Sequence, residues 1–424
     1  MDMILVAGGP GDTLGLARPA VEMVRRAYPA ADVWVFVAPV SRATGREARV
    51  ASSFPGVRRA VPPSEFVRYL ATGIRPPGFA ASGSGVVVHL GGGMTWAACL
   101  SRRLHYPLVT YCSKAIPPAR SVALYLVEDE RAQASLIASG APAEKVRPVG
   151  NLTADSAALS VSRNEARARL GIGEDDRLVG LYPGLRPSEV SAMAPFLFRT
   201  AELLSRVERG VKFIMPLSPF VGTSSLERLF AIPRGKSRPE RSSAVVEKNA
   251  GPIEAVTSEG IRVRIETSAR QETTIASDLA ICTPGPICTE LAANGVAYVA
   301  VIPSNLPHAM TLGGLGGLLS SVPLIGDAIR SSAYKHAAAS SKFFTIPNIK
   351  AGRMVTPEVA GEIGPEDVAI PSVGLLGDPA RRDKIGRELR EAVGGPGASG
   401  RFANQIHLIT GPSSPASLAG PGQG

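Results

Sequence analysis

Two short apolar runs in the second half of the chain constrain the fold more than any other feature. Residues 279–282 (LAIC) and 298–302 (YVAVI) lack the polar–apolar alternation of a half-exposed strand, and a helical pattern over residues 287–294 lies between them. Such runs are typical of parallel strands that are covered on both faces. We therefore expect a strand–helix–strand unit in which a glycine-containing turn, residues 283–286, leads from the first strand into the helix.

This turn also indicates a binding site for an anion. The first amides of a helix have no partner within the helix and lie at the positive end of its dipole, which favours phosphate. We expect Thr283 and Gly285 to lie at a phosphate. We place Glu290 in the first turn of the helix, where its carboxylate can accept hydrogen bonds from a ribose diol. The alternative is that Glu290 only caps the helix and Gly285 only turns the chain.

The same alternation of strands and helices runs through the rest of the chain. It predicts the α/β fold class, with two Rossmann-like, doubly wound domains. The expected parts are a first domain over residues 1–155, a second over 156–375, a C-terminal helix in 376–401 that could return to the first domain, and a disordered tail over 402–424 without Asp, Glu, Lys or Arg. Within the second domain we expect a basic surface loop at 234–248 and a short strand at 343–349.

The net charge and the cysteine and histidine content limit the classes of ligand and partner that the chain can bind. The net charge of +10 permits a phosphorylated substrate, an anionic membrane surface or nucleic acid. Because no Lys/Arg run is interleaved with aromatic residues, nucleic acid is the least favoured. The four cysteines form no CxxC pair and the five histidines are scattered, so we expect free thiols in a reducing cytoplasm and no zinc site. The apolar run at 3–7 is too short for a signal peptide.

An acidic cluster, Glu128-Asp129-Glu130, follows the predicted strand 122–127. Such a cluster could hold Mg²⁺ with a nucleotide diphosphate. We favour the interpretation that these acids cap the following helix, 129–139, and complement its dipole.

Four motifs recur in a fixed order in the second half of the chain. They are LYPGLRPSEV at 181–190, TPGPICTE at 283–290, PNIKAGR at 347–353 and TPE at 356–358. In this set the chain resembles the lipid-A-disaccharide synthase family and its less characterised relatives, over roughly residues 140 to 395. The GGPGD sequence at 8–12 matches more loosely, and VPLIG at 322–326 is similar to the related subgroup.

The resemblance implies a GT-B glycosyltransferase, a hexosyltransferase with two Rossmann-like domains facing a cleft. It further implies a UDP-sugar donor bound in the second domain, a first domain for the acceptor, and no metal or other cofactor. Position by position, the resemblance assigns donor binding to Arg186, Thr283, Gly285, Glu290, Asn348 and Arg353. The alternatives for Arg186 and Arg353 are an ordinary charge at a helix start and a surface turn. If they bind the donor, both arginines could stabilise the charge that develops on the leaving diphosphate.

The acceptor side needs a general base. Asp12 follows the first strand in a glycine-rich loop and is the leading candidate, with a helix N-cap as its alternative. His89 is second, although burial within a strand explains it better. The family carries an aspartate in the loop after the strand 86–90, and this chain has none at 91–94. The expected acceptor loops contain Gly9, Gly11, Gly92 and Gly93.

A weakly charged segment, 306–329, is flanked by His308, Arg330, Lys335 and His336. We expect an apolar lid or a membrane-surface contact for a lipid acceptor, or else a pair of core helices. The leading hypothesis is therefore a glycosyltransferase, cytoplasmic or peripheral at the inner face of the plasma membrane, that acts on a lipid or lipid-linked acceptor. The alternatives are a nucleotide-sugar epimerase or hydrolase, and a non-catalytic nucleotide-sugar-binding protein.

Overall fold

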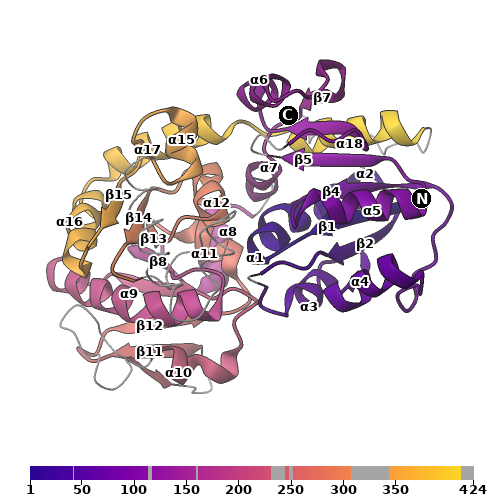
Figure 1. Cartoon of the computed structure of the whole chain (residues 1–424). Helices are drawn as coiled ribbons and strands as arrows, with labels where there is room; N and C mark the ends of the chain where they lie inside the picture. Colours follow the sequence, from indigo (N-terminus) through magenta and orange to yellow (C-terminus); the bar gives the residue numbers. More distant parts are fainter. Residues whose placement is uncertain are drawn as a thin grey trace. The chain divides into compact units, whose positions relative to one another are not determined.

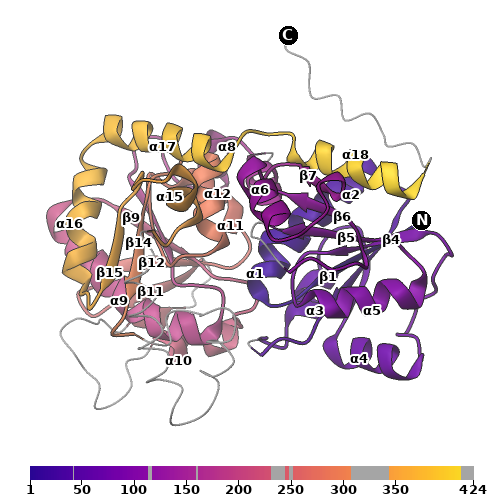
Figure 2. The same ribbon diagram turned by 45° about the horizontal axis from the view of Figure 1, so that its top comes forward.

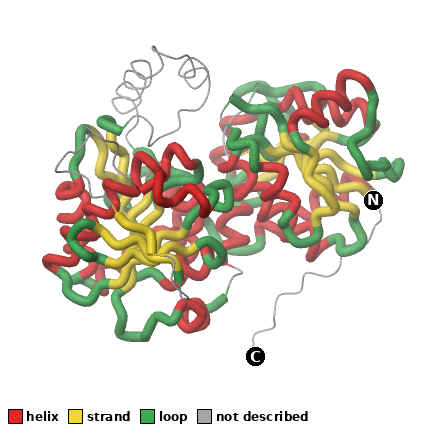
Figure 3. Tube along the Cα trace, turned by 90° about the horizontal axis from the view of Figure 1, so that it is seen from below, coloured by secondary structure: helices red, strands yellow, loops and turns green. Residues whose placement is uncertain are grey.

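The computed structural model describes residues 1–41, 43–112, 117–158, 161–230, 244–247, 252–306 and 343–411. The chain divides into two compact units (Figure 1). Unit 1 contains Met1–Ser156 and the chain from Gly394 onward, and unit 2 contains Ala157–Val393. In each unit a sheet runs between layers of helices (Figure 3).

Unit 1 is built on a seven-stranded parallel sheet of order β3-β2-β1-β4-β5-β6-β7. Its strands are β1 (Asp2–Ala7), β2 (Asp32–Val37), β3 (Val57–Val61), β4 (Gly85–His89), β5 (Leu108–Cys112), β6 (Val122–Val127) and β7 (Val146–Pro148). All six residues of β1 are buried, which explains the continuous apolar run. The strand order reverses between β1 and β4, and ligands of doubly wound sheets bind at the carboxyl ends of such strands.

Helices cover both faces of this sheet. Those of unit 1 are α1 (Pro10–Asp12), a π-helical turn (Thr13–Ala17), α2 (Arg18–Ala27), α3 (Glu47–Ser52), α4 (Pro63–Thr72), α5 (Met94–Leu104), α6 (Glu130–Ala138), α7 (Leu152–Ala158) and α18 (Ala398–Thr410). Phe66 of α4 and Leu100 of α5 join one core cluster with Val6 and Val87 of the strands. Helix α18 packs along α2 (Figure 2).

Helix α18 corrects the expected disordered tail. Residues 402–410 are helical, and Phe402 is fully buried. The Asp155 carboxylate accepts hydrogen bonds from the amides of Gly397 (2.6 Å) and Ser399 (2.8 Å), which fixes the helix start. The buried face of α18 consists of Ala398, Phe402, Ala403 and Ile406, whereas Leu408 is exposed. The remaining tail, 412–424, lies outside the described residues.

Unit 2 contains an eight-stranded mixed sheet of order β10-β11-β12-β9-β8-β13-β14-β15. Its strands are β8 (Leu178–Tyr182), β9 (Lys212–Pro216), β10 (Ala244–Glu247), β11 (Ile253–Thr257), β12 (Arg262–Glu266), β13 (Leu279–Cys282), β14 (Tyr298–Pro303) and β15 (Glu358–Gly361). The pairs from β12 to β15 are parallel, whereas β10, β11 and β12 are antiparallel. The prediction of a loop throughout 234–248 is therefore wrong at β10, whose residues pair with β11; residues 234–243 and 248 lie outside the described part.

The helices of unit 2 are α8 (Arg163–Leu170), α9 (Pro187–Val207), α10 (Leu226–Phe230), α11 (Arg270–Ala276), α12 (Pro286–Asn294), α15 (Ile346–Ala351), α16 (Pro365–Leu376) and α17 (Pro379–Val393). Helices α9 and α16 pack together, as do α8, α11 and α12, and α17 packs on α12 and α15. The expected helix in 376–401 is therefore divided: α17 packs on α12 and belongs to unit 2, whereas the chain from Gly394 onward belongs to unit 1.

The expected strand at 343–349 is wrong. Residues from Ile346 to Ala351 form α15, which has Pro347 in its first turn and ends at Gly352 in the left-handed conformation. The predicted lid segment, 306–329, and its flanking residues His308, Arg330, Lys335 and His336 lie outside the described residues, except for the buried Leu306. In the described ranges no helix is both long and apolar enough to cross a bilayer.

Candidate active site

Four predicted donor residues lie at one edge of the unit 2 sheet. Strands β8 and β13 are parallel neighbours, and both end at this edge. The loop after β8 carries Arg186, and the turn after β13 carries Thr283 and Gly285 before α12 begins. Glu290 follows on α12. The sheet thus collects these residues where a doubly wound sheet binds its ligands.

The turn at Gly285 leaves backbone uncovered. Its φ of 166° is extended backbone that any residue can adopt, and an added Cβ would meet no atom of the described residues within 4 Å. Among these residues, neither strain nor crowding requires glycine here. The open space lies at the start of α12, where the nitrogen of Pro286 carries no hydrogen and the amide of Cys288 donates to the carbonyl of Gly285 at 3.0 Å. The amides of Gly285 and Ile287 are therefore the candidates for binding an anion. A phosphate oxygen can approach these amides more closely than it could over a side chain.

Glu290 is the fifth residue of α12, so its expected place in the first turn is wrong, and so is the capping alternative. Its carboxylate is 3% exposed and its Oε2 atom lies 2.7 Å from Nη1 of Arg270. Arg270 begins α11, directly after the loop that follows β12. The pair places one anion and one cation beside the open turn. The sequence interpretation missed Arg270, although a basic residue at a helix start after a predicted strand offered a signal.

Arg186 is oriented by a carboxylate of its own loop. Its Nη1 atom lies 2.8 Å from Oε1 of Glu189, and Oε2 of Glu189 accepts hydrogen bonds from the amides of Leu185 and Arg186. Gly184, at a φ of +118°, leaves the room for this arrangement, because a Cβ there would lie 2.7 Å from Oε2 of Glu189. Glu189 thus caps α9 and holds the guanidinium at the edge of the sheet.

Asn348 does not join this group. It is fully buried, and its Nδ2 atom donates to the carbonyl of Thr356 and to Oε1 of Glu358, both at 2.9 Å. Its Oδ1 atom accepts from the amides of Val355 (2.9 Å) and Thr356 (3.2 Å). These four bonds use the full capacity of the amide. The structure therefore replaces the predicted donor contact with a clamp on the turn that precedes β15.

Arg353 makes an ion pair with a residue of α17. Its Nη1 atom lies 2.8 Å from Oε2 of Glu388 on α17, and its side chain is 58% exposed. The structure thus matches the surface-turn alternative for this residue. An exposed ion pair of this kind contributes little to stability.

In unit 1, Asp12 lies against the loop that follows β4. A Cβ on Gly91 would lie 2.3 Å from the Asp12 carboxylate, and one on Gly8 would lie 2.7 Å from both Oδ2 of Asp12 and Cα of Gly92. The two glycine loops therefore touch, and Asp12 occupies the space beside the loop that lacks an acid of its own. Asp12 makes no side-chain cap for the π-helical turn that follows it, so the N-cap alternative is wrong.

The predicted acceptor glycines lie in the same two loops. Gly9 precedes α1, and Gly11 sits inside α1 with open space around it. Gly92 and Gly93 have φ values of +81° and +87°, which favour glycine. The two loops follow β1 and β4, the strands between which the sheet order reverses.

His89, the second candidate base, ends β4 and is 7% exposed. Burial lowers its pKa to about 4, so the imidazole is neutral near pH 7. Neither ring nitrogen has a hydrogen-bond partner within the described residues. The structure thus agrees with the burial interpretation of this histidine.

The acidic cluster after β6 caps a helix. Asp129 is the N-cap of α6, and its Oδ1 atom accepts from the amide of Ala132 at 2.9 Å. No group of three or more His, Cys, Asp or Glu residues with metal-binding geometry occurs in the described ranges.

The four cysteines, Cys99, Cys112, Cys282 and Cys288, are free thiols. The Sγ atoms of Cys282 and Cys288, on either side of the donor turn, lie 3.8 Å apart. Burial, and then the neighbouring thiol, raises the pKa of Cys282 well above its ordinary value. This thiol is therefore protonated at neutral pH.

Comparison with known proteins supports the sequence resemblance. No protein-family model matches the chain. The lipid-A-disaccharide synthase of Syntrophus aciditrophicus is 26% identical over 259 residues, which is 60% of this chain and 55% of the relative. The lipid-A-disaccharide synthase of Geobacter metallireducens is 27% identical over 263 residues, which is 61% of this chain and 56% of the relative. The chain thus spans just over half the length of these curated relatives.

Solved structures share the fold at low sequence identity. The Staphylococcus aureus MnaA–UDP structure superposes with a TM-score of 0.58 at 13% identity, over 96% of both chains. The Neisseria meningitidis UDP-GlcNAc 2-epimerase bound to UDP-GlcNAc gives a TM-score of 0.53 at 11% identity, over 96% of this chain and all of the other.

The two doubly wound units and this likeness define the class: the chain is a protein of the GT-B fold. Within that class, about 60% of the chain is similar in sequence to the lipid-A-disaccharide synthases.

Proposed function

We propose that the chain is a glycosyltransferase that moves a sugar from a UDP-sugar to a lipid or lipid-linked acceptor. The observation that carries the proposal is the uncovered turn at Gly285, which adjoins the buried Glu290–Arg270 pair. A diphosphate fits the amides at the start of α12, and a ribose diol fits the Glu290 carboxylate. The names of the curated relatives support a glycosylated lipid as the acceptor.

The proposed chemistry follows from charge. When the bond between sugar and phosphate breaks, negative charge grows on the leaving nucleotide diphosphate. Arg186, Arg270 and the amides at the start of α12 would stabilise this charge without a metal ion or other cofactor. We assign the general base to Asp12, because the two glycine loops of unit 1 enclose its carboxylate.

The test combines binding with turnover. Calorimetric titration with UDP should show saturable binding, and incubation with UDP-sugars and membrane lipid extract should give a glycosylated lipid by mass spectrometry. Asp12→Asn should leave UDP binding intact and abolish the product. Absence of UDP binding would refute the proposal. Release of free UDP without acceptor would point to an epimerase or hydrolase, and tight binding without turnover on any extract would point to a binding protein.

A further inference from the structure

Unit 2 contains a cavity at the edge of its sheet opposite to the donor turn. The cavity has a volume of about 550 Å³. Asp278 and Ala297, which line it, directly precede β13 and β14, whereas the donor turn follows β13. The nine residues of α12 lead from the donor turn to Asn294 and Gly295 in the cavity wall, a length of about 13 Å. The two sites are therefore separate.

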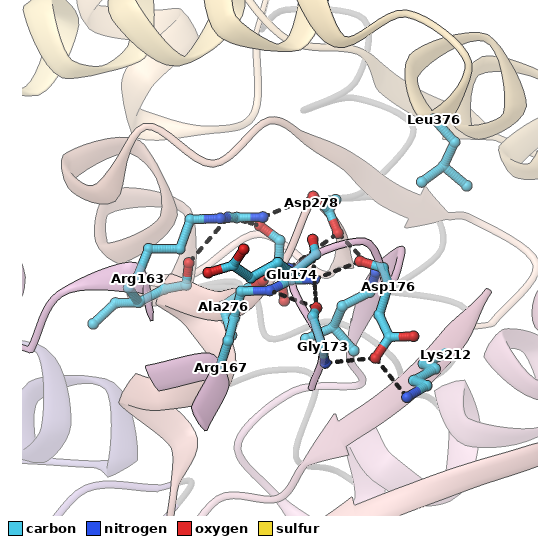
Figure 4. Close-up of polar contacts among 12 residues, drawn as sticks. Arg163, Arg167, Gly173, Glu174, Asp176, Lys212, Ala276, Asp278 and Leu376 are labelled. Carbon is cyan, nitrogen blue, oxygen red and sulfur yellow. Dashed lines mark hydrogen bonds and ion pairs between the residues drawn. The ribbon is translucent and has the colours of Figure 1, made fainter. Parts of the chain in front are cut away.

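Four arginines and two aspartates line this cavity: Arg163, Arg382, Arg387, Arg390, Asp278 and Asp383. The Asp278 carboxylate is already neutralised (Figure 4). Its Oδ1 atom lies 2.7 Å from Nη2 of Arg163, and its Oδ2 atom lies 3.4 Å from Nη1 of Arg167 and accepts the amide of Leu178 at 2.7 Å. Asp383, the other acid in the lining, belongs to α17 together with Arg382, Arg387 and Arg390.

These three arginines use few of their donors within the described residues. Nη1 of Arg382 donates to the carbonyls of Leu375 (2.5 Å) and Leu376 (2.6 Å), and Nη1 of Arg390 donates to the carbonyl of Asn294 at 3.2 Å. Arg387 makes no ion pair or hydrogen bond to any described residue. Each guanidinium carries five N–H donors, so donors on all three remain for a ligand.

The positive field of the cavity also acts on Arg163. Its pKa is lowered, first by burial and then by the like charges of Arg167 and Arg382, although Asp278 opposes this shift. An anion in the cavity would relieve that repulsion. Guanidinium groups bind phosphate through paired, charge-assisted hydrogen bonds.

We propose that this cavity binds the phosphate or diphosphate group of a second ligand, independently of the donor turn. The volume exceeds that of a phosphate group, and the apolar walls at Val161, Ile275 and Val296 can cover the rest of a phosphorylated molecule or lipid headgroup. The site does not depend on the proposed transferase activity.

Calorimetry with pyrophosphate on the full chain tests the site, with and without saturating UDP. We expect UDP to leave one pyrophosphate site available. Arg387→Gln should weaken this site about tenfold, as expected for one lost charge-assisted contact. Asp383→Asn should strengthen it, because the opposing charge is removed. Arg381→Gln is the matched control: Arg381 is an exposed arginine of the same helix that does not line the cavity, and its loss should change nothing.

Vesicles distinguish the source of the phosphate. Cosedimentation with phosphatidylcholine vesicles that contain phosphatidic acid, if lost in Arg387→Gln, would identify a lipid headgroup. Pyrophosphate binding without cosedimentation would identify a free phosphorylated molecule. Pyrophosphate binding that is absent, fully displaced by UDP or equal in Arg387→Gln and Arg381→Gln would overturn the proposal. Because Arg387 is remote from the donor turn, a failure to bind UDP would refute the transferase and leave this result intact.

Discussion

Gly285→Ala tests the donor turn more directly than any other substitution. The added methyl group meets no atom within 4 Å in the part of the chain that the structure describes, and the backbone at this position suits alanine. Folding should therefore be unaffected or slightly favoured, by up to about 1 kcal/mol, because alanine restricts the unfolded chain. A phosphate at the start of α12, in contrast, would have to move away from the amides.

The expected loss in UDP affinity follows from one weakened contact. A hydrogen bond to a charged group contributes about 1.5–3 kcal/mol, and each 1.4 kcal/mol is a factor of ten. The dissociation constant for UDP should therefore rise by roughly 10- to 100-fold, as measured by calorimetry. Urea unfolding in the absence of UDP should show a stability within about 1 kcal/mol of the parent chain.

Gly374→Ala provides the matched control. Gly374 lies in α16, where an added Cβ also meets no described atom within 4 Å, and it belongs to neither proposed site. This substitution should leave UDP affinity unchanged. Equal UDP affinity in Gly285→Ala and the parent chain would refute our placement of the diphosphate.

Three further predictions concern other described contacts. Glu290→Ala should abolish UDP binding and destabilise unit 2 by about 3 kcal/mol in urea unfolding, because Arg270 loses its buried partner; adding Arg270→Met should restore stability but not binding. Asn348→Ala should lower the free energy of unfolding by about 3 kcal/mol, because the hydrogen bonds of the clamp are lost, and should leave the UDP affinity of the folded protein unchanged. A large loss of UDP affinity would instead place Asn348 in the donor site. Burial tends to raise the pKa of Glu266, but hydrogen bonds from Ser268 and its neighbours outweigh this effect and lower the pKa to about 2. About 3 kcal/mol of folding stability should therefore be present above pH 4.5 and be lost as the pH falls towards 2. Glu266→Gln should flatten this part of an acid-unfolding profile.

The sequence predicted those parts of the fold that local patterns specify. Continuous apolar runs identified β1, β13 and β14, and the glycine-containing turns located the loops that carry Asp12 and Gly285. Strand β10 was missed because its neighbours in the chain are polar, and its pairing with β11 depends on tertiary contacts. Helix α18 was missed because an uncharged stretch suggested disorder, whereas its buried face is completed only by unit 1.

The candidate site was predicted where a motif lies at the end of a strand. Asn348 and Arg353 belong to a motif as well. Whether such a polar side chain faces a ligand or binds another part of the protein depends on neighbours that the fold brings together. Here these neighbours are Thr356 for Asn348 and Glu388 for Arg353. For the same reason Arg270 was not predicted: its partner Glu290 comes twenty residues later along the chain.

The position of α18 also affects the order in which the protein can mature during synthesis. Unit 2 occupies the chain between the two parts of unit 1, so the ribosome makes all of unit 2 before the last helix of unit 1. Until then the hydroxyl of Tyr28 lacks the carbonyl of Ala403, and Asp155 lacks the amides of Gly397 and Ser399. The domain that begins first should therefore be the one that finishes last, and its nascent surface would need protection in the interval.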